Sequence, residues 1–176
     1  YQDHMFVVAE DGGSGIQVFD LTQVRGVTGD PVTFSTTASY FGFDTSHNIA
    51  INEDSGYAYV VGTDTCGGGL HMVDISDPLA PSFAGCATFD GYVHDTQCVI
   101  YHGPDVAFQG REICFNAAAQ FFGFSPAGIV NTVEIVDVTD KSNPVQLSSH
   151  EYANDGYSHQ GWLTPDHQYF LHNDEL

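Results

Sequence analysis

A chain of 176 residues that is 42% hydrophobic and 13% aromatic is long and apolar enough to bury a core, which excludes a disordered protein. Its 23 acidic residues against 3 basic ones give a formal net charge of -20 at pH 7. Because nucleic-acid affinity comes largely from Lys and Arg that neutralise phosphates, no nucleic-acid partner is expected and anionic membrane surfaces are poor candidates as partners. No run of about 18 apolar residues occurs, so no transmembrane segment is expected. This charge suits a solvated surface in a salty or extracellular setting.

One pattern occurs three times along the chain. Alternating apolar residues are followed by an acid, an apolar residue and a hydroxyl residue, as in "GIQVFDLTQ" (15–23), "GLHMVDISD" (69–77) and "TVEIVDVTD" (132–140). Each copy predicts a strand that leaves into a turn. A Pro-led segment follows each copy and predicts the next strand: "PVTFSTTASY", "PSFAGCATF" and "PVQLSSHEY".

A histidine opens the strand that comes next in each unit. His47, His94 and His159 are 47 and 65 residues apart, and a turn and a further strand follow each of them. Four short strands with a period near 45 residues are typical of a β-propeller blade. The longer spacing predicts an insertion at Ala117–Val130 in the second unit.

In chain order, the units predict an all-β fold: a β-propeller of four-stranded antiparallel blades. We expect a partial blade at 1–46, a blade at 47–93, a blade at 94–158 with the insertion 117–130, and a partial blade at 159–176. Closed propellers have roughly four to eight blades, and about three to three and a half are present here. We therefore expect a segment of a larger or assembled propeller, which would leave Phe6, Val7, Phe170 and Leu171 wetted in a monomer.

The four cysteines favour two disulfides over free buried thiols, because their count is even and no metal-binding Cys spacing occurs. Cys98 and Cys114 lie in the first and second predicted strands of one blade. Cys66 lies just before the third strand of the preceding blade and Cys86 lies in its fourth. Since antiparallel neighbours bring facing residues within bridging distance, we predict the pairs Cys98–Cys114 and Cys66–Cys86.

Two segments, "LHMVDISDPLAPSFAGC" and "VEIVDVTDKSNPVQLSS", resemble LVIVD repeats. The longer run from "SHNIAINEDSGYAYVV" through "HDTQCVIYHGPD" to "SHQGWLTPDHQYFL" is similar to the choice-of-anchor B family. This resemblance implies a secreted, extracellular or cell-surface β-propeller that reaches the surface through varied C-terminal anchors. It implies fold and location rather than a particular activity. No anchor is visible in the sequence, and "AAAQFFGFSPAGIV" departs from the usual short turn.

The repeated histidines have two interpretations. If each histidine-opened strand is innermost, His47, His94 and His159 lie around one mouth of the channel and could bind zinc or copper, with Asp95 as a ligand or an orienting partner. The favoured interpretation is structural, in which each side chain bonds the backbone of a neighbouring blade. Calcium is a weaker candidate, because the turns "NEDSG" and "DISDP" lack the full calcium-loop spacing.

No nucleophile with a neighbouring base and no phosphate-binding loop occurs. The sequence therefore favours a non-enzymatic extracellular module that binds a protein partner or other copies of itself through its sheet edges. The alternative is a metal carrier or metal-dependent enzyme that uses the histidine cluster, so enzymatic activity is left open.

Overall fold

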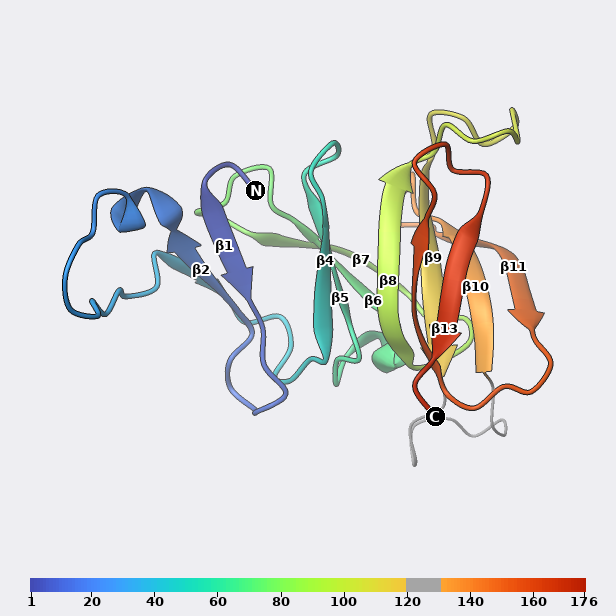
Figure 1. Ribbon diagram of the computed structural model, residues 1–176, viewed down its shortest axis with the longest axis horizontal. Helices are drawn as coiled ribbons and strands as arrows, with labels where there is room; N and C mark the ends of the chain where they lie inside the picture. The colour runs from blue at the N-terminus through green and yellow to red at the C-terminus, as the bar shows by residue number, and fades with distance from the viewer. Residues whose placement is uncertain (120–130) are drawn as a thin grey trace.

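The computed structural model describes residues 1–119 and 131–176, and over these residues the protein is built of antiparallel sheets. Figure 1 shows the first three sheets following one another in chain order from left to right, with the β12–β13 sheet in front of β8–β11. The strands are β1 (His4–Val7), β2 (Ile16–Asp20), β3 (Ala38–Tyr40), β4 (Asn48–Asn52), β5 (Tyr57–Val61), β6 (Leu70–Asp74), β7 (Ser82–Ala87), β8 (Val93–Ile100), β9 (Glu112–Ala119), β10 (Asn131–Asp137), β11 (Val145–Glu151), β12 (Ser158–Leu163) and β13 (Phe170–Asp174). Two short 3-10 helices, η1 (Leu21–Val24) and η2 (Cys66–Gly68), follow β2 and precede β6.

Within each sheet, every strand pairs with the strand that follows it in the chain. The sheets are β1-β2-β3, β4-β5-β6-β7, β8-β9-β10-β11 and β12-β13. The all-β prediction is confirmed, with sheets of up to four strands, and the described residues form no closed propeller.

The repeated acid closes the turn after the second strand of the first sheet and after the third strand of each four-stranded sheet. In all three copies one carboxylate oxygen accepts a hydrogen bond from the backbone N–H two residues on, at 2.8–3.0 Å: Asp20 to Thr22, Asp74 to Ser76 and Asp137 to Thr139. An Asp side chain that mimics a backbone turn in this way ends a strand without leaving the N–H unpaired. The repeat pattern in the sequence therefore encodes a turn.

Adjacent sheets pack face to face, because alternate residues of a strand point to opposite faces. Leu70 and Met72 of β6 point toward the β8–β11 sheet, where they pack in one core with Val93 and Val136 of that sheet. Val73 of β6 points the other way and packs with Ile16 in the core shared with the N-terminal sheet. A third core lies between β8–β11 and β12–β13 and contains Ile113, Phe115 and Leu163.

Two predicted segments differ from the structure. Of "PVTFSTTASY", only Ala38–Tyr40 is a strand, because β2 passes directly into η1 and offers pairing partners only at Ile16–Val18. Within the predicted insertion Ala117–Val130, Ala117–Ala119 belong to β9, since they pair with Asn131–Val133 of β10. The rest of that prediction lies outside the described residues.

The structure contains the two disulfides that the sequence predicted. Cys98 and Cys114 are facing partners of β8 and β9, and Cys66 of η2 joins Cys86 of β7. Two disulfides indicate an oxidising compartment. No helix in the described part of the chain has the length and apolar character to cross a membrane.

Candidate functional site

Two of the three repeated histidines lie on β-bulges. The pairing of β8 with β9 shifts between Val93 and Asp95, and the pairing of β12 with β13 shifts between Ser158 and Gln160. His94 and His159 are thus the extra residues at equivalent places in their strands. Bulges change the direction of a side chain relative to the regular pleat. His47 directly precedes β4, and its backbone N–H donates to the carbonyl oxygen of Val61.

The three imidazoles lie next to one another with their planes tilted by 49° and 39°. The ring centroids of His47 and His94 are 4.1 Å apart and those of His94 and His159 are 4.5 Å apart, so residues from three sheets meet here. His47 Nδ1 lies 2.5 Å from Glu10 Oε1. His94 Nδ1 donates to the carbonyl oxygen of His159 at 2.9 Å. Because a carbonyl oxygen only accepts, this bond places the proton on Nδ1 and leaves Nε2 of His94 with its lone pair.

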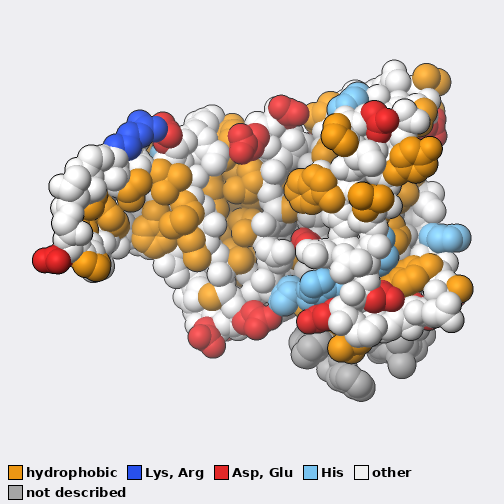
Figure 2. Space-filling view, in the orientation of Figure 1, with side chains coloured by type: hydrophobic (Ala, Val, Ile, Leu, Met, Phe, Trp, Pro, Cys, Tyr) orange, Lys and Arg blue, Asp and Glu red, His pale blue; other side chains and the backbone are white. Residues whose placement is uncertain are grey.

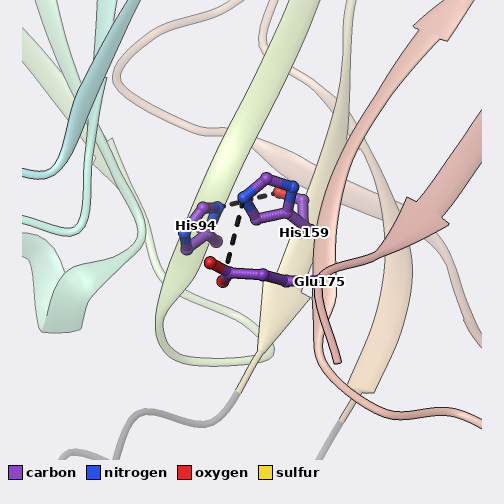
Figure 3. Close-up of side chains that lie close together, drawn as sticks. All are labelled: His94, His159 and Glu175. Carbon is purple, nitrogen blue, oxygen red and sulfur yellow. Dashed lines mark hydrogen bonds and ion pairs between the residues drawn. The ribbon is translucent and has the colours of Figure 1, made fainter.

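A fourth residue, Glu175, completes a group that could hold a metal ion. Its carboxylate Oε2 lies 3.8 Å from Nε2 of His159, and its backbone N–H donates to the carbonyl of Tyr157. Figure 3 shows His94, His159 and Glu175 turned toward one another. One ligand atom from each lies within 4.8 Å of the other two. The sequence prediction missed Glu175, because it has no counterpart in the repeat and only β12–β13 pairing brings it to the histidines.

Asp95 does not belong to this group of potential ligands in the described structure. One of its carboxylate oxygens accepts hydrogen bonds from Asn48 Nδ2 at 3.1 Å and from the backbone N–H of Thr96. Burial raises the pKa of the Asp95 carboxyl. The residue connects β8 to β4, so the structure places it as a link between two sheets.

The environment disfavours the charged form of His94. Burial is the main cause that lowers the pKa of His94, and the neighbouring imidazole of His47 lowers it further. A neutral imidazole keeps a nitrogen lone pair, which a metal ion or a hydrogen-bond donor requires.

A pocket of about 260 Å³ lies on the His47 side of the three imidazoles. Ser46 lines it, and the Ser46 Oγ is buried without a hydrogen-bond partner among the described residues. Figure 2 shows histidines gathered beside acidic side chains on this face of the molecule. The lining residues are Glu10, Thr45, Ser46, His47, Gly62, Thr63, Asp64 and Tyr92.

A larger, apolar pocket of about 430 Å³ lies between the β8–β11 and β12–β13 sheets. β12 packs mainly on β8 and β9, so the face of β10 and β11 beyond it is open. Ile135, Leu147 and Phe170 supply apolar walls. The full lining is Tyr101, Asp105, Phe108, Ile113, Phe115, Val133, Ile135, Leu147, Ser148, Leu163, His167, Gln168 and Phe170.

Comparison with known protein families identifies one repeat in this chain. The LVIVD repeat family matches residues 45–88, which contain the complete β4–β7 sheet. One LVIVD repeat of this chain therefore corresponds to one four-stranded antiparallel sheet. Neither the curated proteins nor the solved structures include a significant match to the chain.

Proposed function

We propose that this chain is a segment of an extracellular or cell-surface β-propeller of the choice-of-anchor B kind, acting as a non-enzymatic binding and assembly module. The sheets that follow one another in chain order support the propeller, as does the LVIVD match to one of them. The strands β4, β8 and β12, which open successive sheets, pack against one another as innermost blade strands do. The two disulfides support the extracellular location.

The incomplete C-terminal sheet carries the assembly proposal. Trp162 of β12 and Leu171 of β13 face each other across the strand pair, and they are 65% and 67% exposed. Figure 2 shows apolar side chains on this sheet and on the N-terminal sheet. Burying such a side chain stabilises a complex by about 1.5–3 kcal/mol. A partner that covers Trp162 and Leu171 therefore gains substantial free energy.

The apolar pocket supports the same docking position. β12 and β13 cover only part of the four-stranded sheet beneath them, and the pocket is the uncovered remainder. Further strands added to the free edge of β13 would lie over Ile135 and Leu147, in the way β7 completes the β4–β7 sheet. Unpaired backbone groups at a strand edge recruit such strands. In a solution of this chain alone, a second copy supplies them.

Sedimentation velocity of the 176-residue chain in moderate salt tests this proposal. Salt screens the repulsion between copies that each carry a charge of -20. We expect the chain to associate increasingly over micromolar concentrations. The variants Trp162→Glu and Leu171→Glu should each weaken this association. Val106→Glu is the matched control, since Val106 is 78% exposed in the loop between β8 and β9 and does not line the pocket. A cooperatively melting monomer at every concentration would contradict the proposal.

A further inference from the structure

We propose that His94, His159 and Glu175 form a binding site for a divalent transition metal of the zinc class, which joins β8 to the β12–β13 sheet. This site is separate from the apolar face used for assembly and does not depend on the proposed function. Two imidazoles and one carboxylate are a ligand set that zinc accepts, with a fourth position for water. The two nitrogen ligands disfavour calcium and magnesium, which prefer oxygen.

The backbone places both histidines for this purpose. His94 and His159 occupy equivalent bulges on neighbouring strands, so each side chain leaves the regular pleat at the same position. Their ring centroids are 4.5 Å apart although they are separated by 65 residues in the sequence. Bulges are frequent next to functional sites because they change the direction of a side chain.

The hydrogen bond of His94 is of the kind that metal-binding histidines make. A histidine ligand almost always donates its other ring N–H to a carbonyl or carboxylate, which fixes the ring and the tautomer. Here the Nδ1–H of His94 donates to the backbone carbonyl of His159, and Nε2 keeps its lone pair. The bond to the neighbouring strand thus prepares one imidazole for coordination.

Glu175 supplies the adjustable ligand. Its backbone is held by the bond to Tyr157, while its side chain is 52% exposed and can change rotamer. The three ligand atoms now lie within 4.8 Å of one another, whereas ligands about 2.0–2.1 Å from a tetrahedral zinc ion are roughly 3.3 Å apart. Rotation of the exposed carboxylate brings it closer to both imidazoles without moving a strand, and small changes in the imidazole rotamers account for the rest.

The test is a zinc titration of the full chain after removal of metals by a chelator. We expect one equivalent of Zn²⁺ to bind in competition with a chromophoric chelator and to raise the melting temperature, since a ligand that binds the folded state stabilises it. Glu175→Gln should weaken zinc binding at least about tenfold and remove the thermal shift, while the protein without metal keeps its melting temperature. His94→Ala and His159→Ala should lose binding as well.

Two matched controls separate this site from unspecific binding to an acidic, histidine-containing surface. Glu53→Gln removes the same charge at an exposed turn, and His102→Ala removes one ring of the other histidine pair, His102 and His167, whose centroids are 3.6 Å apart. Both should bind zinc as the parent chain does. Bound zinc below about a tenth of an equivalent, unchanged affinity in Glu175→Gln, or an equal loss in His102→Ala would each overturn the proposal. Co²⁺ in place of Zn²⁺ should give the visible absorption of a four-coordinate site, and Glu175→Gln should change it.

Discussion

The β4–β7 and β8–β11 sheets have the same strand order and the same Asp turn after their third strand, yet different disulfides stabilise them. Cys98–Cys114 joins the first two strands of its sheet inside the core. Cys66–Cys86 joins a 3-10 helix to the outermost strand, and Cys86 is exposed. The repeat thus determines the backbone of each sheet, while the disulfide is free to vary between sheets.

A buried titratable residue occupies the same repeat position in both sheets. His71 of β6 and Glu134 of β10 are the third residues of the repeated pattern, and each is 2% exposed. His71 bonds Tyr40 and Thr65, whereas Glu134 accepts hydrogen bonds from Asn116 and Gln146. Gln17 holds this position in the first copy. The comparison shows a conserved location for a polar group whose chemistry differs in each sheet.

The largest effect is expected at a buried ion pair of the β8–β11 sheet whose carboxylate also accepts hydrogen bonds from the β4–β7 sheet. Glu112 at the start of β9 accepts hydrogen bonds from Lys141 at 2.7 Å and from Asn52 and Ser55 of the β4–β7 sheet. Burial opposes ionisation of Glu112, but these donors outweigh it and the pKa of Glu112 lies below its ordinary value. Glu112→Ala leaves Lys141 buried without its partner, so we expect a loss of about 3–5 kcal/mol in the free energy of unfolding.

Urea denaturation measures this loss. Glu53→Ala is the control, because Glu53 is exposed in the β4–β5 turn and its removal should change stability by less than about 0.5 kcal/mol. A loss below about 1 kcal/mol in Glu112→Ala would show that the two sheets are held together without this link.

Removing each disulfide should lower the free energy of unfolding by different amounts in the two sheets, and this difference should be smaller than the effect of Glu112→Ala. The sequence separations are 16 and 20 residues, and closing a loop of this size contributes about 3 kcal/mol in either sheet. Replacing Cys98 and Cys114 by Ala also removes sulfur atoms from the core, whereas replacing Cys66 and Cys86 does so at the surface. We expect the first double variant to be the less stable in urea denaturation. Equal stabilities would mean that core packing around the sulfurs adds nothing.

The smallest effect is a pH dependence of opposite sign in the two sheets. Burial lowers the pKa of His71 from 6.5 to about 4, so the unfolded chain binds the extra proton first and His71 destabilises the fold as the pH falls from 6.5 to 4. Burial raises the pKa of Glu134 above its ordinary 4.5, so the unfolded chain loses its proton first. The stability that the neutral Glu134 provides is complete below 4.5 and is lost as the pH rises through its folded pKa.

The variants His71→Gln and Glu134→Gln isolate the two contributions, because each replaces the titratable group by an amide that keeps hydrogen-bonding capacity. Relative to the parent chain, His71→Gln should reduce the loss of stability on acidification. Glu134→Gln should reduce the loss as the pH rises. Thermal unfolding at pH 4 to 8 measures both differences, and parallel pH profiles of parent and variants would contradict them.

The sequence alone determined the features that depend on local chemistry. Period-two alternation and the Asp turn predicted the repeated strands, and their spacing placed Cys98 opposite Cys114 and Cys66 near Cys86. The neighbours in each sheet are neighbours in the chain, so strand order followed from spacing. The positions of the three histidines at the start of their strands followed in the same way.

Only the tertiary structure decided which residues meet between sheets. Of the side chains expected to be wetted, Phe6 is buried in a core cluster, Phe170 packs half-buried against another, Val7 is half-buried, and Leu171 is exposed as expected. Asp95 bonds Asn48, and Glu175 takes the place beside His159. Contacts of this kind depend on which face of the sheet each side chain points to and on how the sheets pack on one another. A single β-bulge changes the direction of the side chains that follow it. Local sequence patterns do not predict these contacts, because the contacting residues lie on different sheets and far apart in the chain.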